Sequence, residues 1–360
     1  MEYESRLFRK NIPVFDNHCH VCFPEPIDDT LRGFENHIRE LGISTFGILS
    51  APRVSHNGVE LDILENLKVL YLKDRLSVPV YAYAGIIDFS ENAEDYVAFA
   101  KSALDMGFDG FKSLEQHPRD RSKNGIGLCD SSFDPFFDYI GKVGAPIVCH
   151  VGDPRFNWSM DTASESAKML GRVYGADFPT LDSLYDEMTQ VFEKHRDVKF
   201  ILAHFYFKSD DYDSLVALME RYTNISLDLT PGTEMYINFS KNIDLWKSFF
   251  LRYSDRIIMG SDLYGAGYGV NRHRLVRAFL ETSEPFVVND RGDVVTPINL
   301  KDRPLEGIYT NNVKKLLMSE PKPVDRKMAY AACKHIAEKR IDELNEIGKA
   351  NLKTFLDFWA

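Results

Sequence analysis

The chain has 360 residues, of which 44% are hydrophobic and 27% are charged, and its formal net charge is −11. A chain of this size and composition can bury a full hydrophobic core, so a disordered protein is excluded. The acidic balance weighs against nucleic acid as a partner, and none is expected, because binding phosphates needs a local excess of Lys and Arg.

The N-terminal sequence MEYESRLFRK lacks the apolar core of a signal peptide. No apolar run approaches the roughly 18 residues of a membrane-spanning helix. These features predict a cytoplasmic protein that acts on a small molecule and has no membrane partner, while a homo-oligomer stays open. The five cysteines are scattered, so we expect no disulfide framework.

Short apolar, β-branched segments alternate with amphipathic stretches along the chain. Eight strands are predicted, at Ile12–Asn17, Ile43–Leu49, Val78–Ile87, Phe108–Ser113, Pro146–Val151, Val198–Ala203, Asn224–Leu229 and Arg256–Gly260. Helices are predicted between most of them, at Thr30–Leu41, Glu60–Lys73, Ala93–Met106, Asp134–Lys142, Leu181–His195, Asp213–Tyr222 and Asn242–Tyr253.

This alternation predicts a parallel sheet of βαβ units, and eight units predict an α/β fold, the closed (β/α)₈ TIM barrel. A doubly wound open sheet is the alternative, but it usually has fewer strands. Its phosphate loop is also missing, since the glycines of GAGYG at 265–269 do not fit that spacing. We expect a single domain over residues 1–360, with a C-terminal helix at 324–360 packed outside the barrel.

Two stretches, residues 152–180 and 264–305, lack the alternation of strands and helices. Both are expected to be long loops on the side where a barrel keeps its active site.

Polar side chains stand at the C-terminal ends of most predicted strands. They are His18 and His20 (first strand), Lys112 (fourth), His150 (fifth), His204 (sixth), Asp228 (seventh) and Asp262 (after the eighth). Strand ends of a parallel barrel converge on one mouth, so these histidines and carboxylates predict a metal site there.

The spacing of the first pair has a geometric reason. Side chains alternate across a strand, so His18 and His20 face the same way and Cys19 faces the helices, as Cys149 does beside His150. These thiols are predicted to be core residues. A Cys19-x-x-Cys22 redox or zinc motif is the alternative, but no second pair follows it.

The motifs FDNHCH, GFDGFKSLEQHP, PIVCHVGDP, FEKHRDVKFILAHF, IIMGSDLYG and IYTNNVKKLL carry a resemblance that spans nearly the whole chain. The sequence resembles the amidohydrolase superfamily, and within it the amidohydrolase 2 group of metal-dependent TIM-barrel hydrolases. That group also includes aminocarboxymuconate-semialdehyde decarboxylase and related non-oxidative decarboxylases.

The resemblance implies that His18, His20, His150 and Asp262 hold a divalent ion, most often Zn²⁺ in this group, with His204 beside the activated water or the substrate. Lys112 is placed where some superfamily members have a carbamylated lysine that bridges a second ion. The other interpretation, an ammonium that binds a substrate carboxylate, is preferred, and with it a single ion.

A bound Zn²⁺ lowers the pKa of water to about 7 and polarises a carbonyl group. Asp262 is suited to accept the proton of that water, and His204 to stabilise an oxyanion or act as a second acid or base. These parts suffice to hydrolyse a small amide, lactone or ester. They could equally decarboxylate a small carboxylic acid, and an inactive barrel that serves as a binding protein is a third hypothesis.

The substrate-binding residues are predicted to be Lys112, Arg155, Trp158 and Tyr206, and the arginine suits an anionic substrate. Other side chains are given lesser roles, as follows. His56, His117 and His273 lie further along their loops, and one or more of them is expected to reach the substrate. His37, His195 and His335 are expected at the surface. Asp228 and Asp16 are expected to orient a ligand histidine.

Overall fold

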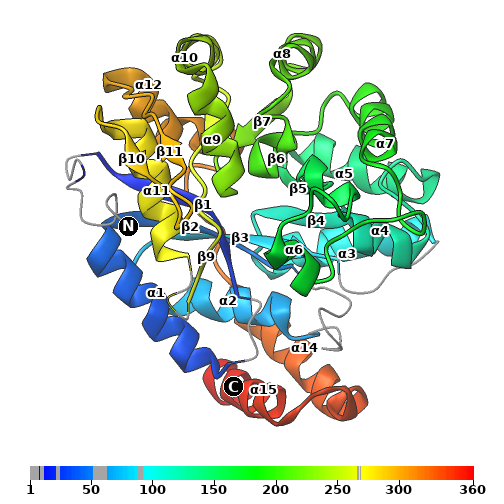
Figure 1. Cartoon of the computed structure of the whole chain (residues 1–360). Coiled ribbons are helices and arrows are strands. Elements are labelled where there is room, and N and C mark those ends of the chain that lie inside the picture. Colours follow the sequence, from blue (N-terminus) through cyan, green and yellow to red (C-terminus); the bar gives the residue numbers. More distant parts are fainter. Residues whose placement is uncertain are drawn as a thin grey trace.

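Strands alternate with helices along most of the chain, as predicted (Figure 1). The computed structural model describes residues 8, 12–21, 25–51, 63–86, 92–265, 267 and 269–360. The strands are β1 (Val14–His20), β2 (Ile43–Leu49), β3 (Val80–Gly85), β4 (Gly110–Gln116), β5 (Ile147–Val151), β6 (Phe200–Leu202), β7 (Ile225–Asp228), β8 (Ile257–Ile258), β9 (Leu263–Tyr264), β10 (Phe286–Val287) and β11 (Val294–Val295).

The helices between the barrel strands are α1 (Ile27–Leu41), α2 (Glu65–Arg75), α3 (Ala93–Met106), α4 (Pro118–Asn124), α5 (Asp134–Val143), α6 (Glu165–Met169), α7 (Leu181–Lys194), α8 (Tyr212–Arg221), α9 (Thr233–Lys241) and α10 (Ile243–Arg252). Those after the barrel strands are α11 (Val270–Glu281), α12 (Asp302–Glu306), α13 (Asn312–Leu316), α14 (Arg326–Lys339) and α15 (Glu346–Trp359). Short single turns join several of these elements.

Local sequence signals end the helices that precede the strands. Gly42, Gly107 and Gly144 stop α1, α3 and α5 in the left-handed conformation, which a residue without a Cβ adopts without strain. Each of these helices is followed within a few residues by the next strand, so the chain returns quickly to the sheet. The result is the short connection that a βαβ unit needs at the bottom of a barrel.

The sheet closes on itself. Its order is β8-β7-β6-β5-β4-β3-β2-β1-β9, all parallel, and its two edges, β8 and β9, are only four residues apart in the chain. Asn17 N donates to Met259 O (3.1 Å), and Asp262 N donates to His18 O (2.8 Å). The segment 259–262, which joins β8 to β9, therefore runs along β1 and closes the barrel. The fold is therefore the predicted (β/α)₈ TIM barrel, with a helical C-terminal region.

Two buried clusters lie on the two sides of the sheet. The larger one fills the space between the strands and the outer helices, and it holds Cys19 and Cys149 as predicted. The smaller one fills the barrel, with Phe15, Tyr83 and Ile201 among its members, and Val313 of α13 joins it from below. The barrel is thus a packed core, and its chemistry must sit at the open mouth.

The two long stretches contain more regular structure than expected. Residues 264–305 form β9, α11, the β10–β11 hairpin and the start of α12, and residues 152–180 contain a short turn at Arg155–Trp158 and α6. The prediction of long loops was wrong for α11, whose buried face includes Val276 and Phe279. The Gly- and Asn-rich flanks of that segment hid its helical periodicity.

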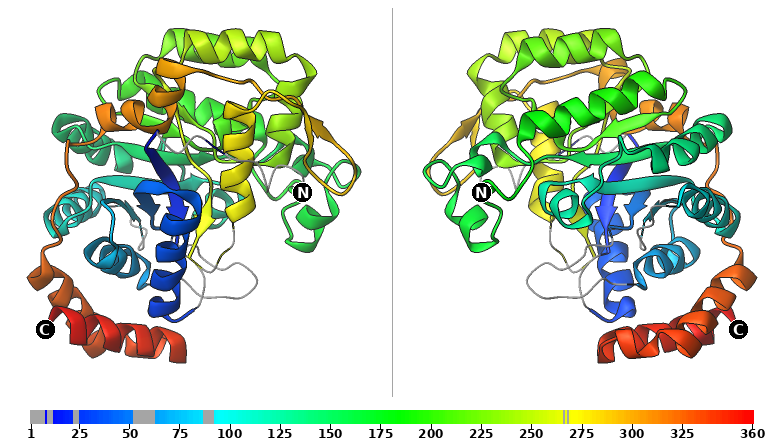
Figure 2. Two further views of the ribbon diagram at one scale, coloured as in Figure 1. Left: turned by 90° about the vertical axis from the view of Figure 1, so that its left-hand side faces the viewer. Right: turned by 90° about the vertical axis from the view of Figure 1, so that its right-hand side faces the viewer.

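The C-terminal residues form two helices, α14 and α15, and not the single predicted helix, because a turn at Ile341–Glu343 separates them; both lie along the outside next to α1 and α2 (Figures 1 and 2). Asn351 of α15 accepts a hydrogen bond from Ile27 N (2.8 Å), and the ring of Phe355 lies 5.2 Å from that of Tyr71. In the part of the chain that the structure describes, no helix is long and apolar enough to cross a membrane.

Candidate metal centre

The first histidine pair lies at the end of β1, where the strand is irregular. Its pairing with β2 shifts between Asp16 and Cys19, as in a β-bulge, and side chains alternate regularly from His18 to His20. His18 and His20 face each other at the barrel mouth, while Cys19 packs in the outer core. The predicted common orientation of the two histidines is confirmed.

Both imidazole rings are fixed through Nδ1. His18 Nδ1 lies 2.6 Å from Asp228 Oδ2, and His20 Nδ1 donates to Leu49 O (3.0 Å), because a carbonyl can only accept. Burial alone would raise the pKa of Asp228, but the charge and hydrogen bond of His18 lower it to about 2. Asp228 is therefore a carboxylate that accepts from His18, as predicted, and both rings carry a proton on Nδ1.

Three electron-rich atoms then converge. His18 Nε2 lies 3.1 Å from His20 Nε2, which in turn lies 3.4 Å from Asp262 Oδ1. Burial is the largest cause that lowers the pKa of His20 well below its ordinary value, so a second proton on this ring is disfavoured. At these distances the three atoms have the spacing of ligands around one cation. These atoms therefore fit a divalent metal ion with nitrogen and oxygen ligands.

Asp262 is held in a fixed orientation. Its φ of 58° lies in the left-handed region, and its side chain accepts hydrogen bonds from Arg272 and from the Tyr264 hydroxyl (3.5 Å to Oδ1). Burial would raise the pKa of Asp262, but Arg272 and then the neighbouring histidines lower it. The carboxylate is thus ionised and aimed at the histidine pair.

His204 lies between this group and β5. It begins a run of left-handed residues through Phe207, and its backbone N donates to Asp228 Oδ1 (2.9 Å). Its ring centroid is 5.7 Å from that of His18 and 4.8 Å from that of His150. Burial lowers the pKa of His204 to about 4, so the ring is neutral. This position suits the predicted role beside the reacting groups.

His150 belongs to another group. The ligand atoms of His18, His20 and Asp262 all lie within 4.8 Å of one another, and so do those of His117, His150 and Asp153, a second set. The structure thus brings together three of the four predicted ligands. The role of His150 as the fourth ligand of the first ion stays a prediction.

Lys112 is buried on β4 beside the site. Burial is the main reason that the pKa values of His20 and His204 are lowered, and the positive charge of Lys112 lowers both further. Its amino group is therefore within electrostatic reach of both rings. Carbamylation of Lys112 and binding of a substrate carboxylate stay alternative predictions.

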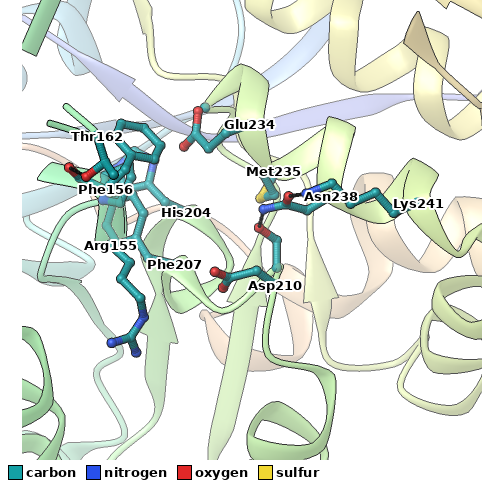
Figure 3. Close-up of a pocket in the computed structure, with 13 residues that line it drawn as sticks. Arg155, Phe156, Thr162, His204, Phe207, Asp210, Glu234, Met235, Asn238 and Lys241 are labelled. Carbon is teal, nitrogen blue, oxygen red and sulfur yellow. Dashed lines mark hydrogen bonds between the residues drawn. The ribbon is translucent and has the colours of Figure 1, made fainter. Parts of the chain in front are cut away.

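A pocket of about 380 Å³ opens next to His204 (Figure 3). This volume suits a small molecule. Glu234 lines the pocket, and burial raises its pKa. The full lining is Pro154, Arg155, Phe156, Thr162, His204, Phe207, Ser209, Asp210, Gly232, Glu234, Met235, Asn238 and Lys241.

The three predicted substrate-binding residues after β5 and β6 have different positions. Arg155 lines the pocket, but its guanidinium turns away from Glu234 (Figure 3) and lies 3.4 Å from Asp182. The indole of Trp158 donates to Pro179 O (3.0 Å), so this side chain links two parts of the segment 152–180. Tyr206 lies in the outer core, because the left-handed turn directs its buried side chain towards the helices. The structure thus corrects the expectation that Tyr206 faces the mouth.

Several other histidines differ from expectation. His56 lies outside the described residues. His37 and His195 are buried, not at the surface, because each ring has polar partners: Tyr264 O for the first, and Asp134 and Asp138 for the second. His335 is exposed as predicted.

Asp16 does not bind a ligand histidine, as had been expected. It accepts a hydrogen bond from Ser261 and lies 2.9 Å from His273 Nδ1, so these three residues brace the chain before Asp262. His273 is fully buried there.

A family model described as Amidohydrolase matches residues 25–317. The chain belongs to this amidohydrolase family. A search of curated proteins finds no match for the sequence.

Solved structures share the barrel fold of this chain at low identity. A TIM-barrel protein of Bordetella bronchiseptica superposes with a TM-score of 0.55 at 12% identity, covering 85% of this chain and 98% of that one. The 5-carboxyvanillate decarboxylase of Sphingomonas paucimobilis gives 0.50 at 12%, covering 85% and 99%. The 4-oxalomesaconate hydratase of Rhodopseudomonas palustris gives 0.50 at 12%, covering 90% and 99%. At this identity the likeness supports the fold alone.

Sequence reasoning missed Asp153, Asp120 and Tyr174, which surround the second histidine group. A signal was present for Asp153, which follows His150 by three residues in HVGD and so starts the loop at the same mouth. No local signal marks Tyr174, which comes from the far end of the insertion.

Proposed function

We propose that this amidohydrolase-family protein is a metal-dependent hydrolase of a small carbonyl compound, an amide, lactone or ester. The observation that carries the proposal is the convergence of His18 Nε2, His20 Nε2 and Asp262 Oδ1 at the barrel mouth. A divalent ion held there, with Zn²⁺ as the expected metal, would lower the pKa of water and polarise a carbonyl.

The chain's own residues supply the proton transfers. Asp262 is an ionised carboxylate, and it can accept the proton of the attacking water. His204 is neutral and lines the pocket, and its Nδ1 donates to Thr230 O (3.2 Å), so its free Nε2 can accept a proton and then pass it to the leaving group. Asp228 keeps His18 in the tautomer that presents Nε2, and it also binds His204 N.

The runner-up is decarboxylation of a small carboxylic acid, and one observation favours it. Glu234 lines the pocket with its pKa raised by burial, so it is held closer to the protonated form. A carboxylic acid in that position could protonate the carbon that loses CO₂. The decarboxylase title of one structural neighbour fits this alternative but does not transfer the activity.

The test is a screen of lactones, amides, esters and aromatic carboxylic acids with the zinc-loaded protein, scored for acid release against CO₂ release. Acid release supports the hydrolase, and CO₂ release would replace it with the decarboxylase. His204→Asn should lose turnover yet keep the metal. A protein that binds no zinc and does not respond to a chelator would instead fit a binding protein.

A further inference from the structure

A second group of buried ligand-type atoms lies at the same mouth. His117 follows β4 and precedes α4, His150 ends β5, and Asp153 comes three residues after it. His117 Nε2 lies 3.7 Å from Asp153 Oδ2, and His150 Nε2 lies 3.6 Å from Asp153 Oδ1. The three residues are only 1%, 7% and 3% exposed. From this geometry we propose that His117, His150 and Asp153 hold a second divalent metal ion, so that His150 binds this ion in place of the first.

The distances support an ion over a network of direct bonds. Separations of 3.6 and 3.7 Å are longer than an N–H···O hydrogen bond, and Nε2 of both rings makes no hydrogen bond within 3.5 Å. In tetrahedral zinc coordination with bonds of about 2.1 Å, ligand atoms stand roughly 3.4 Å apart. Buried ring nitrogens without a bonded partner are costly, and an ion among the three residues removes that cost.

The second group repeats the construction of the first. His117 Nδ1 lies 2.9 Å from Asp120 Oδ2, as His18 Nδ1 lies 2.6 Å from Asp228 Oδ2. A carboxylate thus lies beside Nδ1 of one histidine in each group, the usual place of the support of a metal-binding imidazole, but only His18 makes a hydrogen bond to it. The group's own carboxylate is supported too.

That support is a tyrosine hydroxyl in both groups. Tyr174 donates to Asp153 Oδ2, and Tyr264 donates to Asp262 Oδ1. Such hydrogen bonds hold the carboxylate in a fixed orientation beside the histidines. The ring of His204 is close to His150 on one side and to His18 on the other, so the second ion would adjoin the pocket that His204 lines.

The inference rests on the proposed function for its catalytic meaning, but it can be tested without turnover. The full-length protein is stripped of metal, reloaded with excess Zn²⁺, and dialysed, and zinc per chain is measured by elemental analysis. We expect two ions in the wild type, and one each in His117→Gln and His18→Gln. When the proteins are loaded with Co²⁺ instead, the visible absorption per chain of each of these two variants should be about half that of the wild type.

His195→Gln is the matched control, because His195 is also buried beside two carboxylates, Asp134 and Asp138, but outside the mouth. It should keep both ions. Tyr174→Phe removes no ligand, so it tests the second site even if the variants that lack a ligand fail to fold. It should weaken zinc binding at one of the two sites by about tenfold or more.

One ion in the wild type that survives in His117→Gln and is lost in His18→Gln would overturn the second site and leave the proposed function standing. No bound zinc in the wild type would overturn both.

Discussion

His18 Nε2 and His20 Nε2 face each other at 3.1 Å, while Nδ1 of each ring points to an acceptor, Asp228 Oδ2 for His18 and Leu49 O for His20. With Asp262 Oδ1 beside them, the two Nε2 atoms have the spacing of ligands around one cation. It follows that the metal should stabilise the fold as well as serve the chemistry.

Removing the metal is therefore expected to lower the melting temperature. An ion present at a hundred times its dissociation constant stabilises the folded state by about 3 kcal/mol. Differential scanning calorimetry with and without a chelator measures this loss, and added Zn²⁺ should restore it. An unchanged melting temperature would argue against the site.

Asp228→Asn should weaken zinc binding at the first site by about 10–100-fold. The amide of asparagine can donate to His18 Nδ1, which favours the tautomer with its proton on Nε2, where the ion must bind. Titration calorimetry with Zn²⁺ measures the change. The control is Asp244→Asn in the first turn of α10, which should bind zinc as the wild type does.

Gly260→Ala should disturb the same site through packing. A Cβ at this position would lie 2.8 Å from His18 Cβ and 2.7 Å from Thr230 Oγ1. We expect a stability loss of about 1–3 kcal/mol, measured by denaturant unfolding, with weaker zinc binding. Gly175→Ala is the matched control, because a Cβ there meets no atom within 4 Å. Equal behaviour of the two variants would contradict the close approach of Gly260 to His18.

Glu115 should make stability fall as the pH rises. Burial raises its pKa from 4.5 to about 7 in the folded state, so the folded protein holds a proton that the unfolded chain releases. The stabilising contribution is full below pH 4.5 and is lost as the pH rises through 7.

Glu115→Gln, which stays neutral, should therefore gain roughly 2 kcal/mol of unfolding free energy relative to the wild type between pH 5 and pH 8. Denaturant unfolding across this range measures the difference. Glu346→Gln at the exposed start of α15 should show no such trend. A pH-independent difference for Glu115→Gln would refute the raised pKa.

The fold was predictable because strand and helix periods alternate along the chain. The histidine pair was predictable too, because a spacing of two residues keeps His18 and His20 on one side of a strand. The second group was not, since His117 and Asp153 come from different loops and meet only after the barrel closes. Tyr206 was misplaced because a left-handed turn of non-glycine residues has no reliable sequence signature.

The central claim is that His18, His20 and Asp262 bind a metal ion. A crystal of the zinc-loaded protein, measured on both sides of the zinc absorption edge, tests it most directly. We predict an anomalous peak among His18 Nε2, His20 Nε2 and an oxygen of Asp262. A well-ordered mouth with no peak at that position would contradict the account.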